Sequence, residues 1–234
     1  MKTVRIVAIL SVLHLLTSMG FAQTAPVPEK TFEAANHLRI EIKEAPPGAQ
    51  PSAVQVICYL KHKPAGDTTL EAVADFDREL GGIVQQLRDS DQFEGYPLET
   101  LYFESPRNTI KARGVLLVGV GDESEVSVET MKNVGTVALR NAMLINASTV
   151  SFAAGLQDQN VKKLDVGDVA GAVVTGAILA YDTEKRLQQR GLLPPRNINE
   201  WVIEAGPPFF KRTVEGVDAA VKKADAEVAA RKSL

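Results

Sequence analysis

The sequence has a single cysteine and only three histidines among its 234 residues. One cysteine cannot form a disulfide within the chain, so a packed core must supply the stability of the fold. Cys58 lies in the apolar run 54–60, where a buried thiol is the expected role and a bridge to another chain is the alternative. His37 and His62 lie in different segments without ligand-like spacing, so we expect no metal site at either.

The sequence also lacks an excess of positive charge. It carries 26 Lys and Arg against 29 Asp and Glu, for a formal net charge of −3 at pH 7. Because phosphate contacts require a basic surface, we expect no nucleic-acid partner. The patterns His-Glu-x-x-His and Gly-x-Ser-x-Gly are absent, so neither a zincin nor a hydrolase elbow is indicated. We therefore assign no catalytic residue, no metal ligand and no cofactor.

Long apolar runs are missing too, and the only candidate lies at the N-terminus. Lys2 and Arg5 precede an apolar run over residues 6–16, and Gly20 and Ala22 occupy the −3 and −1 positions of a cleavage site. This layout is typical of a secretory signal, whereas a helix that spans the bilayer needs about 20 apolar residues. We predict that residues 1–22 are a cleaved signal peptide and that the protein is exported to the periplasm or the medium. A permanent anchor is the alternative, and no membrane contact is expected after cleavage.

The remaining chain is long enough for one domain with a sizeable core. Residues 23–36 contain Pro and Ala and are expected to be a flexible lead-in. We expect a single domain over residues 37–234 that ends in a helix over 207–231.

Strand and helix patterns alternate along this domain. Alternating or continuous apolar residues predict strands at 37–43, 53–60, 99–104, 113–120, 148–153 and 198–204. Apolar residues at helical spacing predict helices over 67–87, interrupted at 81–82, and over 127–144, 165–181 and 207–231. Asp67, Ser127 and either Asp165 or Asp168 can cap three of them. This alternation predicts a three-layer α/β/α domain with a mixed, mostly parallel sheet.

Short motifs occur along the chain in a characteristic order. They are DRELGG at 77–82, FEG at 93–95, ETL at 99–101, RGVLLVGVG at 113–121 and GAILAYD at 176–182. Together with the helix over 127–144, this order resembles the N-terminal domain of the leucine aminopeptidase (cytosol aminopeptidase) family over about residues 37–230. The resemblance implies a fold similar to the macro domain, a nucleotide-binding α/β module.

The same resemblance locates the peptidase chemistry in a second domain. In that family a lysine and several acidic residues hold two metal ions, partly in a stretch that reads Asn-Thr-Asp-Ala-Glu-Gly-Arg. This sequence does not contain that stretch, so no catalytic residue is carried over. We therefore expect an exported, non-catalytic interaction or assembly module. The alternatives are a module that binds a small, nucleotide-like ligand and an accessory subunit of a metallo-aminopeptidase completed by a separately encoded peptidase chain.

A glycine loop is the first candidate site. Gly119, Gly121, Asp122 and Ser124 follow a buried strand and precede a helix, which is where ligands gather in α/β sheets. Glycines allow a close backbone approach, and amides before a helix can hold an anion. The third glycine of a dinucleotide fingerprint is missing and the acidic side chains repel phosphate, so a plain tight turn is the alternative.

The last helix is the second candidate site. Phe210, Val214, Val217 and Val221 are spaced by four, three and four residues and form one apolar seam. The seam could pack on its own domain or on a partner helix, for example in a homo-oligomer, as subunits assemble in the family.

Overall fold

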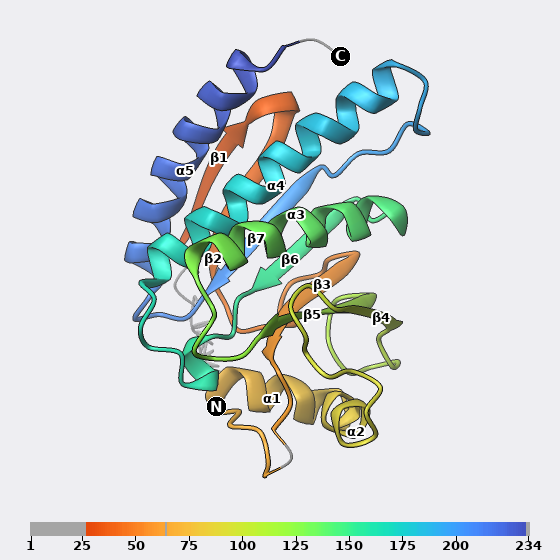
Figure 1. Cartoon of the computed structure of the whole chain (residues 1–234), viewed down its shortest axis with the longest axis vertical. Coiled ribbons are helices and arrows are strands. Elements are labelled where there is room, and N and C mark those ends of the chain that lie inside the picture. The colour runs from red at the N-terminus through yellow and green to blue at the C-terminus, as the bar shows by residue number, and fades with distance from the viewer. Residues whose placement is uncertain (1–26, 64, 233–234) are drawn as a thin grey trace, which may run out of the picture.

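A computed structural model describes residues 27–63 and 65–232. The signal peptide predicted over residues 1–22 lies outside this range. The described chain folds around one seven-stranded sheet in the order β1-β2-β7-β6-β3-β5-β4. The five inner strands are parallel, while β1 and β4 are antiparallel edges. This arrangement confirms the predicted α/β fold with a mixed, mostly parallel sheet (Figure 1).

The strands and helices follow the predicted order closely. The strands are β1 (Glu29–Ala34), β2 (Leu38–Glu44), β3 (Val54–Leu60), β4 (Thr100–Glu104), β5 (Gly114–Gly121), β6 (Thr149–Ala153) and β7 (Glu200–Ala205). The α-helices are α1 (Glu71–Glu79), α2 (Ile83–Asp89), α3 (Val128–Leu144), α4 (Val166–Gln189) and α5 (Phe210–Ala230). Every residue of β3 and of β5 is buried, as their continuous apolar sequences predict for strands covered on both faces.

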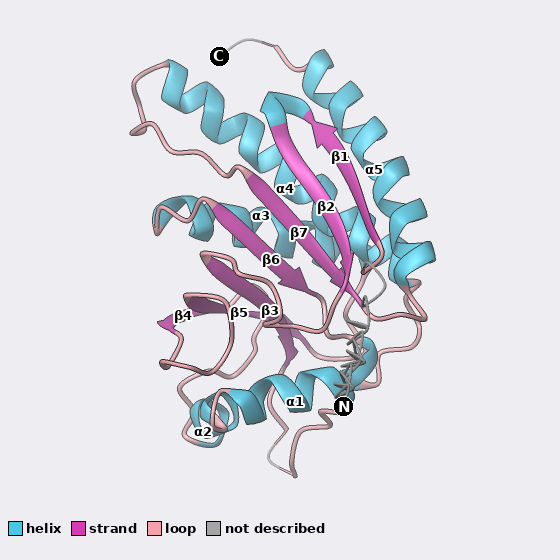
Figure 2. Cartoon of the chain, turned by 180° about the vertical axis from the view of Figure 1, so that it is seen from behind, coloured by secondary structure: helices cyan, strands magenta, loops and turns pink. Residues whose placement is uncertain are grey.

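The helices cover the two faces of the sheet unequally. One apolar cluster joins α3, α4 and α5 to β2, β3, β5, β6 and β7. A smaller cluster joins α1 and α2 to β3 and β5, with side chains of β4 packed against it. Figure 2 shows β2, β7 and β6 in front of α3 and α4, with α1 and α2 at the bottom of the view.

Glycines bring the three large helices unusually close together. A Cβ atom added to Gly135 on α3 would collide with the backbone of Val173 on α4, and one on Gly176 would collide with the backbone of Lys132. Gly216 on α5 likewise faces the backbone of Gly167 on α4. The small residues of α4 therefore serve tight helix packing.

Two predictions about local structure were wrong. The lead-in expected over residues 23–36 contains β1, because residues 29–34 pair antiparallel with β2 and lie beside α5. Asp67 does not cap α1, which begins at Glu71; instead, its carboxylate binds Arg88 and His62. The caps predicted from Ser127 and Asp165 are confirmed, since each side chain accepts hydrogen bonds from amides of the first helical turn. None of the helices in the described ranges has the length and hydropathy of a membrane span.

Candidate functional site

A cavity of about 530 Å³ opens at the carboxyl edge of the sheet. Its walls are the ends of β2, β6 and β7, the loops that follow these strands, and the first turns of α1, α4 and α5. Parallel strands end at one edge, so side chains from residue 44 to residue 213 meet there. Ligands of open α/β sheets bind at this edge.

Most of the cavity wall is apolar. The large apolar side chains are Phe152, Leu156, Val161, Leu164, Val166, Val169, Ile203 and Phe209. Phe152 also stacks on Trp201, with ring centroids 6.0 Å apart and an interplanar angle of 23°. Trp201 is the only tryptophan of the sequence, so its fluorescence reports on this wall.

The titratable side chains of the wall are all acidic. They are Glu44, Glu71, Asp158 and Glu204, and no Lys, Arg or His lines the cavity in the described part of the chain. Burial raises the pKa of Asp158, and the neighbouring Glu71 adds to this shift, although the Val73 amide donates to Asp158 Oδ2 at 3.1 Å. Glu71 has a φ of 46°, a strained conformation of the kind found at ligand sites.

Glu204 is the most deeply buried of the four acids. Only 8% of the residue is exposed. Gln55 Nε2 donates to Glu204 Oε2 at 2.6 Å, and the Gly48 amide donates to Gln55 Oε1 at 2.9 Å, which fixes the orientation of the amide side chain. Glu204 Oε1 has no hydrogen-bond partner among the described residues. Burial raises the pKa of Glu204 to about 8.

The predicted glycine loop lies away from this cavity. The space beside Gly119 is filled by the backbone of Gly95 and Tyr96, and a Cβ on Gly121 would lie 2.8 Å from Pro97. Asp122 and Ser124 are exposed, and none of the four loop residues lines the cavity. The two glycines are thus explained by the close approach of residues 95–97, and ligand binding at this loop stays a prediction.

The predicted seam of α5 packs within the chain. Val217 and Val221 are buried in the main apolar cluster, and Phe210 and Val214 pack against it from partly buried positions. The structure therefore favours the first alternative, packing on its own domain.

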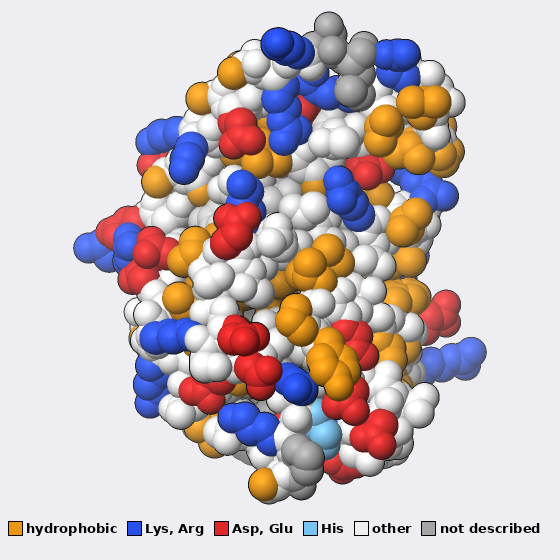
Figure 3. Space-filling model, viewed as in Figure 1, with side chains coloured by type: hydrophobic (Ala, Val, Ile, Leu, Met, Phe, Trp, Pro, Cys, Tyr) orange, Lys and Arg blue, Asp and Glu red, His pale blue; other side chains and the backbone are white. Residues whose placement is uncertain are grey.

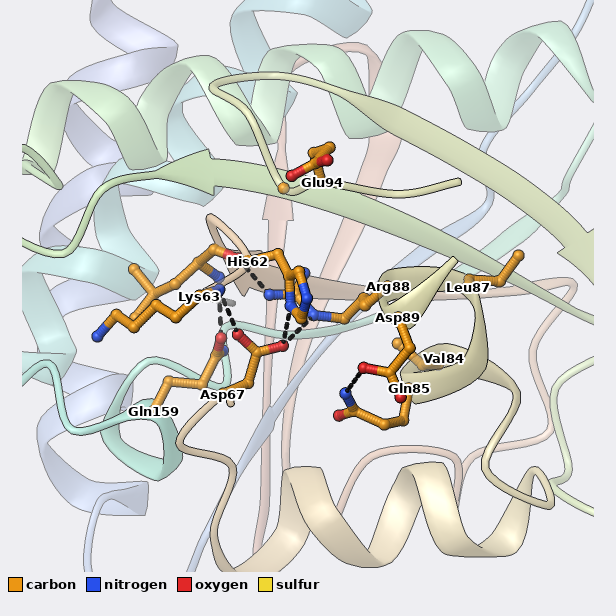
Figure 4. Close-up of polar contacts among 12 residues, drawn as sticks. His62, Lys63, Asp67, Val84, Gln85, Leu87, Arg88, Asp89, Glu94 and Gln159 are labelled. Carbon is orange, nitrogen blue, oxygen red and sulfur yellow. Dashed lines mark hydrogen bonds and ion pairs between the residues drawn. The ribbon is translucent and has the colours of Figure 1, made fainter. Parts of the chain in front are cut away.

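A buried ion pair at the end of β3 was not predicted (Figure 4). Arg88 Nε donates to Asp67 Oδ2 at 2.6 Å, and His62 Nδ1 lies 2.9 Å from the same oxygen. The guanidinium also donates to the Leu60 carbonyl and lies 5.2 Å from the centre of the Tyr59 ring. Burial alone would raise the pKa of Asp67, but hydrogen bonds from Arg88 and His62 hold it below its ordinary value. This cluster anchors the loop after β3, and His62, Asp67 and Arg88 are not among the residues that line the cavity at the ends of β2, β6 and β7.

The arrangement of candidate metal ligands and of basic side chains bears on two other kinds of site. No three His, Cys, Asp or Glu side chains of the described ranges are grouped so that they could hold a metal ion. On the face shown in Figure 3, both basic and acidic side chains are present over the whole length of the molecule.

Comparisons with known proteins identify relatives of one family. The family model described as cytosol aminopeptidase family, N-terminal domain, matches residues 56–190. A probable cytosol aminopeptidase of Thermosynechococcus vestitus is 26% identical over 131 residues, which are 54% of this chain and 25% of that protein. A probable cytosol aminopeptidase of Alkaliphilus oremlandii is 28% identical over 130 residues, 53% of this chain and 25% of that protein. The chain thus spans about a quarter of the length of these relatives.

Solved structures share the fold at low sequence identity. A macrodomain of Oceanobacillus iheyensis with ADP matches with a TM-score of 0.60 at 13% identity, covering 85% of this chain and all of the macrodomain. A tomato leucine aminopeptidase mutant matches with a TM-score of 0.57 at 16% identity, covering 77% of this chain and 36% of the enzyme. These likenesses show that the domain has the fold of a macrodomain and of part of a leucine aminopeptidase.

Proposed function

The chain belongs to the cytosol aminopeptidase family through the N-terminal domain of that family, and on this premise we propose that the domain binds a small organic molecule in the cavity at the ends of β2, β6 and β7. The observation that carries the proposal is the cavity itself, with a volume of about 530 Å³. Sites for small molecules in proteins are concave, mostly apolar and about 300–1,000 Å³ in volume.

The wall has the two parts that such a site needs. Apolar side chains from β6, β7 and α4 can cover the body of a ligand. A few polar groups, with Glu204 the most buried among them, can fix its orientation. The macrodomain with ADP is an example of a protein with this fold and a small molecule. Likeness of fold supports a function less strongly than the residues of the cavity wall do.

We favour ligand binding over association because the cavity at the sheet edge is open, whereas the apolar seam of α5 is packed against its own domain. The seam of α5, on which the expectation of an assembly module depended, is packed inside the chain. We retain export as part of the proposal on the strength of the predicted leader, which lies outside the described residues.

A cavity-filling variant tests the proposal. Ala154 is half-buried in the loop after β6 and lines the cavity, so Ala154→Phe should fill it. Ala226→Phe places the same side chain at an exposed position of α5 and serves as the control. A fragment library is screened by ligand-observed NMR against the wild type and both variants.

We expect fragments that compete for one site in the wild type and in Ala226→Phe and that do not bind Ala154→Phe. Fluorescence titration should show the same pattern, because Trp201 stacks on the cavity residue Phe152. A library without hits, or hits that bind Ala154→Phe as tightly as the wild type, would contradict the proposal.

A further inference from the structure

The charge of the cavity wall restricts the chemistry of its ligand. Glu44, Glu71, Asp158 and Glu204 line the cavity, while the cations of the described chain lie elsewhere. Charges of one sign around a concave site with low-dielectric walls concentrate the potential inside it. This wall therefore attracts positive groups and repels phosphates and carboxylates.

Glu204 supplies a specific contact within this field. The residue is 8% exposed and lines the cavity, and its Oε1 atom has no hydrogen-bond partner among the described residues. Leaving a buried polar atom unpaired is unfavourable because the atom has lost its hydrogen bonds to water without replacing them. Because Glu204 lines an open cavity, a donor group of a ligand can supply the hydrogen bond that Oε1 lacks.

The neighbours of Glu204 show why the chain itself does not supply that donor. Gln55 donates to the other oxygen of the carboxyl, at 2.6 Å. Gln55 Oε1 is engaged by the amide of Gly48, so the side chain is held in place from both ends. The remaining neighbours in the wall, such as Ile203 and Ala205, carry apolar side chains.

We propose, on the basis of the function proposed above, that the ligand is an organic amine: an apolar body that lies against Phe152 and Val169, with an ammonium group that donates to Oε1 of the ionised Glu204 carboxylate. A neutral donor such as an alcohol could complete the hydrogen bond but would not use the negative charge of the wall. A phosphate or carboxylate would meet that charge unfavourably. A bare metal ion would lack enough ligands, because no three acidic side chains converge in the described ranges.

The test uses a series of probes with one apolar body and three head groups. 4-Phenylbutylamine carries the ammonium group, 4-phenylbutanol the neutral donor and 4-phenylbutyrate the negative charge; ADP represents phosphate ligands. Dissociation constants are measured by calorimetry at pH 9, above the pKa of about 8 of Glu204, for the wild type and for Glu204→Gln. Glu227→Gln, at an exposed position of α5, is the matched control.

The amine should bind the wild type at least tenfold more tightly than the alcohol, and the carboxylate should bind least. Glu204→Gln should lower the affinity for the amine about tenfold and leave the affinity for the alcohol within about threefold, and Glu227→Gln should change neither. If Glu204→Gln does not fold, the order of the three probes on the wild type still decides the question.

The outcomes separate this inference from the function on which it rests. Equal binding of amine and alcohol, or preferred binding of 4-phenylbutyrate or ADP in the cavity, would overturn the amine assignment while the cavity remains a ligand site. Failure of all four probes to bind overturns the amine assignment, and an empty fragment screen then removes the proposed function as well.

Discussion

Replacing Glu204 with glutamine should change how the stability of the domain depends on pH. Burial raises the pKa of Glu204 from 4.5 to about 8 in the folded chain. The unfolded chain exposes this carboxyl to water, where its pKa returns to the ordinary value. Between these two pKa values the folded protein therefore holds a proton that the unfolded protein has released.

The sign and size of the effect follow from proton linkage. The favourable contribution of the neutral, buried Glu204 is fully present below pH 4.5 and is lost as the pH rises toward 8. Each pH unit in this window removes about 1.4 kcal/mol from the free energy of unfolding, so the loss approaches 5 kcal/mol at the upper end, on the order of a large fraction of a domain's stability. A glutamine keeps an acceptor for Gln55 and does not titrate, so this loss disappears in the variant.

The assay is urea unfolding followed by Trp201 fluorescence at pH 5, 6, 7 and 8. The difference in the free energy of unfolding between Glu204→Gln and the wild type should shift in favour of the variant by about 1 kcal/mol or more per pH unit. In Glu227→Gln, where the side chain is exposed, the difference from the wild type should stay constant to within about 0.5 kcal/mol. A difference for Glu204→Gln that is equally constant would refute the reasoning.

Three further predictions concern packing, the ion pair and the leader. Arg88→Met should lower the free energy of unfolding by about 3–5 kcal/mol in urea titrations, since it leaves Asp67 buried without its cation; a loss below about 1 kcal/mol would contradict this. Gly135→Ala should cost about 1–3 kcal/mol because its methyl group meets the backbone of α4, whereas Gly206→Ala, which has room for a Cβ, should be nearly neutral; equal costs would argue against the close helix contact. Mass spectrometry of protein secreted by a bacterial host should find an N-terminus at Gln23, and an intact leader would count against the predicted cleavage.

The parts of the fold that sequence patterns predicted are those fixed by local interactions or by continuous burial. β3 and β5 are recognisable because strands covered on both faces have nearly continuous apolar sequences. Ser127 and Asp165 cap helices through contacts with amides two or three residues away. Such contacts leave a short-range signal in the sequence.

The missed features depend on partners that are distant in the sequence. β1 is largely polar and becomes a strand because β2 offers a free edge and α5 lies beside it. Asp67 has the chemistry of a helix cap, but Arg88, 21 residues away, takes its carboxylate.

The cavity itself could not be predicted, because its wall is assembled from strand ends and helix starts spread from residue 44 to residue 213. Two local signals pointed toward it: a glutamine inside the apolar strand β3 and a glutamate near the end of the apolar strand β7. Gln55 and Glu204 break the apolar pattern where they meet each other in the folded chain.

The central claim is that the ligand occupies the cavity at the ends of β2, β6 and β7, and a crystal structure of the protein soaked with 4-phenylbutylamine tests it most directly. The account predicts electron density for the phenyl ring beside Phe152 and for the amino nitrogen within hydrogen-bond distance of Glu204 Oε1. Density at the loop of Gly119 and Gly121 with an empty cavity, or no density in crystals whose cavity is open to solvent, would contradict it.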